Sequence, residues 1–220
     1  MTLRDVAFWV RSARADFRLN RLRHERKTAA AFDYLYAGSS DPFGTELPQY
    51  RYQRRKYDSL ISMLPRQAYR NVLDVGCGLG TFTRKLAPFA GYILGTDISA
   101  VAIEQARKLS AVHSNIVYSH EDMLSNPGEA LFDLIVLADT LYYIDPLTDV
   151  ALKSIACNLS VKLAPGGLLL LVNHYFFGFD ASSRGTREIH DAFRWTSGLQ
   201  HVAEHRRAFF LATLLRRSDA

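Results

Sequence analysis

The chain of 220 residues has only two cysteines and no long apolar run. Cys77 and Cys157 lie far apart, and neither belongs to a Cys-x-x-Cys or Cys/His cluster, so we expect neither a disulfide framework nor a bound metal. No apolar run approaches the about 18 residues of a membrane span. The N-terminus also lacks the uninterrupted apolar core of a signal peptide. We therefore expect a protein of the reducing cytoplasm.

Outside its N-terminus the chain has no excess of charge of either sign. The net charge is +5, and residues 1–30 alone contain eight Lys or Arg against three Asp or Glu. A nucleic-acid partner is therefore not expected. Within this basic segment Val6, Trp9, Ala13 and Phe17 recur at helical spacing, which predicts an amphipathic helix. We favour its packing against the rest of the chain; a dimer contact and an interfacial membrane contact are the alternatives.

The most informative stretch is residues 71–83, which read NVLDVGCGLGTFT. A short apolar run ends in Gly76, Gly78 and Gly80, a pattern typical of a buried parallel strand that is followed by a tight turn. A helix then begins near Thr81, with its partly positive N-terminus aimed at the same place. The motif predicts a nucleotide-like ligand above this strand.

Spacing and acidic residues narrow the kind of nucleotide. The pattern G-x-G-x-G differs from the dinucleotide fingerprint G-x-G-x-x-G, and Asp74, just before it, would repel a pyrophosphate but suits a cationic or amino-bearing ligand. The next strand ends in Asp97, which can accept both ribose hydroxyls. After the third strand, Asp122 and Met123 form a pair that can bond an adenine amino group and cover its ring.

Strands and helices alternate along the rest of the chain. The predicted strands are 72–75, 92–97, 116–119, 132–138 and 167–174, with helices at 81–88, 100–110 and 146–161. Ser99 is the expected N-cap of the second of these helices, and Pro165-Gly166-Gly167 is the expected turn into the fifth strand. We expect a Gly/Ser-rich loop over residues 178–185. Residues 200–206 and 208–215 are expected to form a closing antiparallel pair of strands.

This order predicts an α/β fold, a Rossmann-like doubly wound, mostly parallel seven-stranded sheet with an N-terminal helical lid. The expected boundaries are a basic extension over 1–30, a helical lid that covers the cofactor over 31–66, and the Rossmann-like core over 67–220.

In such sheets ligands bind outside the carboxyl ends of the strands. Tyr142 and Tyr143 follow the fourth strand, and Asn173, His174 and Tyr175 end the fifth, so all five are expected to face a second substrate. Core packing is the alternative for the two tyrosines after the fourth strand. We predict His174 and Tyr142 as the catalytic residues, with the histidine as a base.

The ordered set of glycine loop, ribose acid and adenine acid resembles class I methyltransferases that use S-adenosylmethionine (SAM). Four further segments, Asp41-Pro-Phe-Gly44, Tyr52-Gln-Arg-Arg-Lys-Tyr57, residues 137–143 (LADTLYY) and residues 163–167 (LAPGG), are similar to the NodS-type nodulation methyltransferases. This resemblance covers about residues 33–215. It implies SAM as cofactor, S-adenosylhomocysteine (SAH) as product, and methylation of the free glucosaminyl amine of a chitin-like oligosaccharide.

The resemblance also implies roles for single residues. Arg55 would reach the carboxylate of the methionine moiety, because its fixed fork of donors suits a carboxylate. Asp74 and Gly76 would hold the amino group and backbone of that moiety. The remaining predicted cofactor residues are Gly78, Gly80, Asp97, Ile98, Asp122, Met123 and Ala138.

The expected acceptor is a small molecule, with an amine nitrogen of an amino sugar, oligosaccharide or natural product as the first choice. A methyltransferase that acts on oxygen or carbon of a small aromatic or lipid is the alternative, and its mark would be a wholly apolar acceptor pocket with a single base. An NAD(P)-dependent oxidoreductase and a non-catalytic SAM-binding module are the remaining alternatives.

Overall fold

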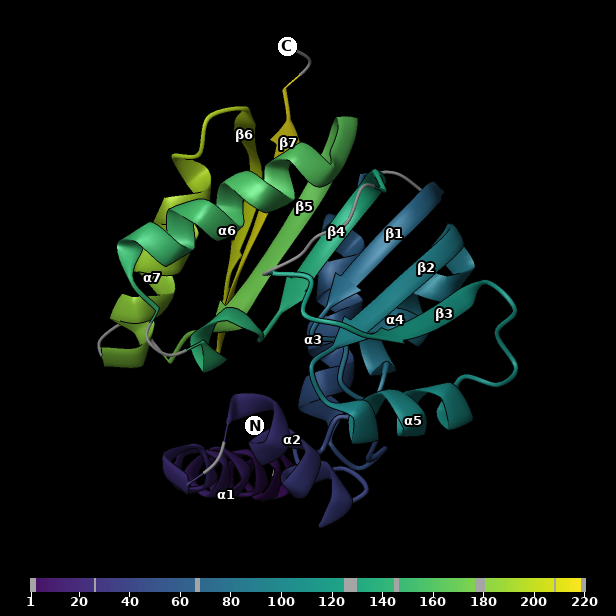
Figure 1. The fold of residues 1–220 in the computed structure, drawn as a ribbon, viewed down its shortest axis with the longest axis vertical. Helices are drawn as coiled ribbons and strands as arrows, with labels where there is room; N and C mark the ends of the chain where they lie inside the picture. Colours follow the sequence, from purple (N-terminus) through teal and green to yellow (C-terminus); the bar gives the residue numbers. More distant parts are fainter. Residues whose placement is uncertain are drawn as a thin grey trace.

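The computed structural model describes residues 3–25, 27–65, 68–124, 130–144, 147–176, 181–207 and 209–218. Within these ranges seven strands form one sheet in the order β3-β2-β1-β4-β5-β7-β6 (Figure 1). The strands are β1 (Tyr69–Val75), β2 (Ala90–Asp97), β3 (Ile116–His120), β4 (Phe132–Ala138), β5 (Leu163–His174), β6 (Leu199–Arg206) and β7 (Phe210–Arg217).

The sheet is mostly parallel, as predicted. Strands β1 to β5 pair in parallel, and β7 is antiparallel to both β5 and β6. The predicted closing antiparallel pair is thus confirmed. Dinucleotide-binding sheets have the order 3-2-1-4-5-6, whereas here β7 lies between β5 and β6. The strand order therefore argues against the oxidoreductase alternative.

Helices cover both faces of the sheet. They are α1 (Leu3–Glu25), α2 (Thr28–Ala37), α3 (Arg51–Met63), α4 (Thr81–Leu86), α5 (Ala100–Leu109), α6 (Asp149–Lys162) and α7 (Ala181–Arg194), with short 3-10 turns η1 (Ala87–Phe89) and η2 (Leu141–Tyr143). Helices α3 and α4 pack on one face through residues such as Leu60 and Phe82, and α6 and α7 pack on the other through Leu159 and Phe193. None of the described helices is long and apolar enough to cross a bilayer.

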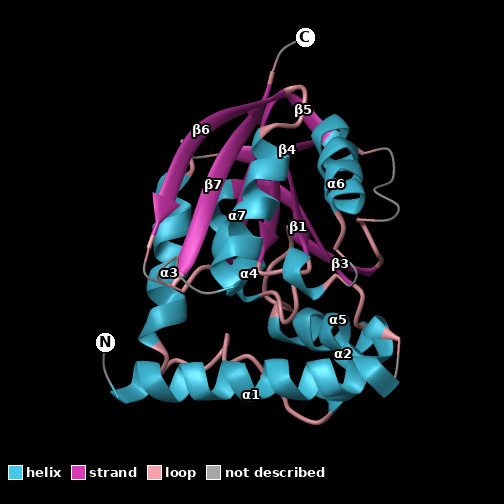
Figure 2. Cartoon of the chain, turned by 90° about the vertical axis from the view of Figure 1, so that its left-hand side faces the viewer, coloured by secondary structure: helices cyan, strands magenta, loops and turns pink. Residues whose placement is uncertain are grey.

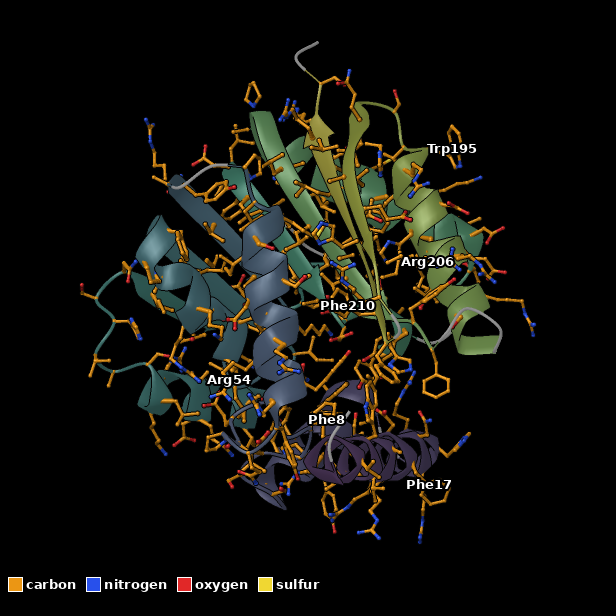
Figure 3. All side chains as sticks on the ribbon, turned by 180° about the vertical axis from the view of Figure 1, so that it is seen from behind. Phe8, Phe17, Arg54, Trp195, Arg206 and Phe210 are labelled. Carbon is orange, nitrogen blue, oxygen red and sulfur yellow. The ribbon has the colours of Figure 1, made fainter. Side chains whose placement is uncertain are left out.

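Helices α1 and α2 lie across the end of the molecule toward which the parallel strands run (Figures 1 and 2). The predicted N-terminal helix is present, but its predicted inner face is wrong in part: Trp9 packs inward against Tyr52 and Phe209, whereas Val6 and Phe17 do not face the core. The structure buries Phe8, Leu19 and Leu22, whereas Val6 is 44% and Phe17 is 74% exposed. Figure 3 shows Phe8 pointing toward the body of the protein and Phe17 pointing away from it. The inner face therefore differs in part from the one predicted.

Helix α3, which we predicted to be part of the lid, packs into the core against one face of the sheet. The cover over the strand ends thus consists of α1 and α2, whose buried residues form a cluster of their own that includes Leu19, Leu35 and Leu79. That residues 31–66 form a lid that covers the cofactor stays a prediction.

The loop predicted over residues 178–185 is wrong from residue 181 onward, where α7 begins; residues 178–180 lie outside the described residues. A hydroxyl anchors this end of the helix, because Oγ of Ser183 accepts a hydrogen bond from the N–H of Phe176 at 2.9 Å. Ile189 and Phe193 then bury the inner face of the helix. Small polar residues in the first turn concealed this amphipathic pattern.

The turn predicted at residues 165–167 lies inside β5. The register with β4 shifts between Leu163 and Leu168, and Gly166 has a φ of 66°, so the three residues form an irregular bulge within the strand. A left-handed residue at this place explains why the sequence has glycine there.

Candidate active site

A cavity of about 1110 Å³ lies at the carboxyl ends of the parallel strands, and residues of α1 and α2 line its opposite side. Pockets for one small ligand have volumes of roughly 300–1,000 Å³, so this cavity is large for a single small ligand. We call the part at the tips of β1, β2 and β3 the glycine half; it is lined by Asp74, Gly76, Gly78, Asp97, Ile98, Asp122 and Met123. We call the rest the aromatic half; it is lined by Trp9, Asp16, Tyr52, Lys56, Ala138, Asp139, Tyr142, Tyr143, His174, Phe176 and Phe209.

The glycine turn between β1 and α4 has left-handed backbone at Gly76, Gly78 and Gly80, with φ of 73°, 53° and 72°. A Cβ at Gly78 would lie 2.9 Å from the hydroxyl of Tyr36, and a Cβ at Gly80 would overlap the hydroxyl of Tyr118. Gly76 and Gly78 line the cavity. Gly80 does not; it caps the start of α4 and leaves space for the tyrosine.

Asp74 is 3% exposed near the end of β1 and lines the cavity. Burial raises the pKa of Asp74 to about 6; the hydrogen bond from the hydroxyl of Thr83, at 2.6 Å, opposes this rise, and the charge of Asp97 adds to it. A cation that binds beside Asp74 would favour the ionised form of this buried carboxylate.

Asp97 ends β2 and is held by two backbone donors. Its Oδ2 accepts from the N–H of Gly78 at 2.9 Å, and its Oδ1 accepts from the N–H of Ser99 at 2.9 Å. Burial raises the pKa of Asp97, while these two bonds lower it. Ser99 is the N-cap of α5, as predicted, and accepts from the N–H of Ala102 at 3.1 Å. The carboxylate is thus fixed at the point where the glycine turn meets β2.

Three further predicted residues complete the glycine half. Ile98 follows Asp97, and Asp122 and Met123 follow β3; all three line the cavity. Oδ1 of Asp122 accepts from the N–H of Leu124 at 3.1 Å. The glycine half therefore offers Ile98, Met123 and the carboxylate of Asp122 for a purine. It also offers one carboxylate for a ribose, that of Asp97, and one for an ammonium group, that of Asp74. This set of groups fits SAM.

Arg55 is not brought to the cavity. Its side chain is exposed on α3, like that of the neighbouring Arg54 on the outer surface in Figure 3. Gln53 and Lys56 face inward instead and line the cavity. Oε1 of Gln53 is buried and has no hydrogen-bond partner among the described residues, which leaves it available to a ligand.

Lys56 is 4% exposed and forms an ion pair with Asp139, the residue directly after β4. Of the residues that the structure describes, Asp139 alone combines a side chain with a positive φ, which is 57°. Its N–H donates to the carbonyl of Val172 at 2.8 Å. Strained backbone of this kind is found where the position of a side chain matters. Ala138, the predicted cofactor residue beside it, also lines the cavity.

Both tyrosines of η2 line the aromatic half, as predicted. Burial raises the pKa of Tyr143 well above its usual range, so its hydroxyl stays protonated; it donates to Oδ1 of Asp16 on α1 at 2.8 Å. The hydroxyl of Tyr142 donates to that of Tyr143 at 3.4 Å. Burial raises the pKa of Asp16, the bond from Tyr143 lowers it, and the charge of Asp139 raises it further. Sequence reasoning missed Asp16.

His174 lines the aromatic half at the end of β5. Its ring lies 5.4 Å from that of Trp9, edge to face, and 6.2 Å from that of Phe176, stacked, measured between centroids. The prediction that Asn173 and Tyr175 face the second substrate is wrong, because neither lines the cavity and both are buried. Successive side chains of a strand point to opposite faces, so the two neighbours of His174 point away from the cavity.

The sheet order, the glycine turn and the acids at three successive strand ends define a class I methyltransferase fold. The model of one family, described as Nodulation protein S (NodS), matches residues 37–174. The chain therefore belongs to the NodS family of SAM-dependent methyltransferases.

Individual relatives agree with this assignment. Nodulation protein S from Rhizobium tropici is 34% identical over 118 residues, which cover 54% of this chain and 49% of that protein. Its counterpart from Sinorhizobium fredii is 34% identical over 134 residues, covering 60% and 58%. The matched sequence thus spans about half the length of these relatives. The crystal structure of N-methyltransferase NodS from Bradyrhizobium japonicum with SAH superposes with a TM-score of 0.71 at 25% identity, covering 87% of this chain and 99% of that one.

Proposed function

We propose that this protein transfers the methyl group of SAM to the nitrogen of a small amine. The observation that carries the proposal is the chemistry of the aromatic half, where the carboxylates of Asp16 and Asp139 lie among aromatic rings. For a methyltransferase that acts on oxygen or carbon of an aromatic compound or lipid we expect a wholly apolar acceptor pocket with a single base. Asp139 is paired with Lys56, so Asp16 is the carboxylate that favours a cationic acceptor, and aromatic faces attract a cation by about 0.5–2 kcal/mol.

The glycine half would hold SAM. Asp97 would accept from the ribose hydroxyls, Asp122 and Met123 would hold the adenine, and Asp74 would pair with the ammonium group. When bound, SAM supplies a methyl group that its sulfonium already activates. The protein therefore has to position and deprotonate the acceptor more than it has to activate the donor.

Positioning accounts for much of the expected rate enhancement. Two reactants held about 3–3.5 Å apart in line can gain roughly 7–11 kcal/mol in the barrier from alignment alone. Residues of α1 and α2 line the cavity on the side away from the sheet and would help to keep water from the reacting groups. An amine attacks only as the free base, so a proton acceptor is needed in the aromatic half. His174 and Tyr142, predicted from the sequence as catalytic, both line that half.

Nitrogen is supported as the target because the solved relative from Bradyrhizobium japonicum is an N-methyltransferase. Amino sugars are the first acceptors to test, since the sequence resembles enzymes that methylate a glucosaminyl amine. Aromatic amines are the second, because Trp9, Tyr52 and Phe209 line the aromatic half.

Two experiments test the proposal in sequence. In a thermal-shift screen, SAM and SAH should stabilise the protein, by about 2.7 kcal/mol at one hundred times the dissociation constant, whereas NAD and NADP should not. Mass spectrometry with methyl-deuterated SAM should then detect a labelled product with glucosamine, a partly deacetylated chitooligosaccharide or tyramine. Stabilisation by SAH together with labelling of a phenol and of no amine would contradict the choice of nitrogen.

A further inference from the structure

Helix α1 carries one carboxylate into the cavity, that of Asp16. Its Oδ1 accepts the hydrogen bond from Tyr143 at 2.8 Å. The ring of Tyr143 is itself held by three others, with centroid distances of 5.3 Å to Phe32, 6.1 Å to Phe43 and 4.3 Å to Tyr142. The carboxylate therefore has a fixed position in the aromatic half, and none of the described residues donates to its second oxygen.

The charges around Asp16 are unbalanced. The carboxylate of Asp139 forms an ion pair with the buried Lys56. No Lys, Arg or His in the described part of the chain forms an ion pair with Asp16. Burial raises the pKa of Asp16 and the charge of Asp139 adds to this rise, so the ionised form is disfavoured at this position. A cation bound beside it would favour the ionised form.

We propose that Asp16 binds the ammonium group of the acceptor and takes up its proton before methyl transfer; this inference rests on the proposed function. The N–H bond breaks, the proton moves to the free oxygen of Asp16, and its electron pair stays on nitrogen as a lone pair. Nitrogen then forms the N–C bond while the C–S bond breaks and leaves its electron pair on sulfur. The products are a methylated ammonium ion and SAH, and Asp16 returns its proton to water.

The other groups that titrate or carry charge in this half are already engaged in different ways. They are Tyr142 and Tyr143 of η2, Asp139 after β4, Lys56 and Tyr52 of α3, and His174 of β5. The carboxylate of Asp139 is tied to Lys56, and the ring of His174 lies against Trp9 and Phe176. Asp16 also precedes the matched family range 37–174.

The test compares the wild-type protein with Asp16→Asn, which keeps an oxygen for the hydroxyl of Tyr143 and removes the charge. Asp191→Asn is the matched control, because Asp191 is exposed on α7 and does not line the cavity. Calorimetry measures the affinity for SAH first, and then the affinity of the SAH-saturated protein for tyramine. Steady-state kinetics with glucosamine and tyramine follow, from neutral to alkaline pH.

We expect Asp16→Asn to bind SAH like the wild type, to bind tyramine at least tenfold more weakly, and to lose about 10²–10⁴-fold in kcat/KM at neutral pH. The loss should shrink as pH rises, because the amine then loses its proton in solution. A loss that stays constant with pH, or wild-type tyramine binding, would overturn the role of Asp16 and leave the proposed function intact. A wild-type protein that binds SAH but methylates neither amine would overturn the amine assignment and this inference with it.

Discussion

Binding of SAH should release a proton from Asp74. In the free protein burial raises the pKa of Asp74 to about 6. An ammonium group beside it would return the carboxylate to its ionised state, so at pH 6 about half a proton should leave for each ligand bound. If only the ionised form binds, the affinity for SAH should be about tenfold weaker at pH 5 than at pH 7.

The same pKa sets how the stability of the free protein depends on pH. The folded-state pKa of about 6 lies above the ordinary value of 3.8 for an aspartate, so the folded protein holds this proton more tightly than the unfolded chain does. The resulting stabilisation is complete below pH 3.8 and is lost as pH rises through 6. About 3 kcal/mol is lost, because each pKa unit corresponds to about 1.36 kcal/mol. Saturation with SAH should abolish this loss.

Isothermal titration calorimetry at pH 6, in two buffers of different ionisation enthalpy, measures the proton release directly. The control is Asp74→Asn, which keeps an acceptor for the hydroxyl of Thr83 and has no proton to release. Other acids in the cavity titrate in both proteins, so the difference isolates Asp74. Equal proton release from both proteins, or equal SAH affinity at pH 5 and pH 7, would refute the pairing of Asp74 with the ammonium group.

Three further substitutions test the glycine half. Asp97→Ala should abolish SAH binding in calorimetry, because it removes the proposed ribose acceptor and leaves the N–H of Gly78 without its partner; normal affinity would exclude that role. Arg55→Ala should leave SAH affinity unchanged, since its side chain lies outside the cavity, and a clear loss would reinstate it as a cofactor residue. Gly80→Ala should lower the melting temperature. Its cost in stability should exceed the about 1 kcal/mol for losing a glycine at positive φ, because the new Cβ also overlaps Tyr118; unfolding at the wild-type temperature would contradict this packing.

The glycine half could be predicted because each of its parts is local in sequence. Gly76, Gly78 and Asp97 stand at strand ends that apolar runs and glycines define, and parallel pairing alone brings those ends together. The alternation of strands and helices also predicted a mostly parallel sheet, although it did not predict the strand order. The place of β7 between β5 and β6, which separates this sheet from a dinucleotide fold, depended on recognising the final antiparallel pair.

The aromatic half could not be predicted in the same way, because its contacts join distant segments. The ion pair between Lys56 and Asp139 spans 83 residues, and the hydrogen bond between Asp16 and Tyr143 spans 127. No local pattern encodes either pairing. Only the packing of α1 and α3 against the end of the sheet places these residues together.

The helical phase of α3 nevertheless indicates which of its side chains point inward. On α3, Gln53, Lys56, Tyr57 and Leu60 share one face at the spacing i, i+3, i+4 and i+7. Tyr57 and Leu60 are apolar and pack into the core. Lys56 lies on the same face of the helix and therefore also points inward, whereas Arg55 lies outside this face and is exposed to solvent. The choice of a cavity residue within a basic run is thus decided by its apolar neighbours one turn away. The chemistry of the side chain, which made arginine attractive, carries no information about which way it points.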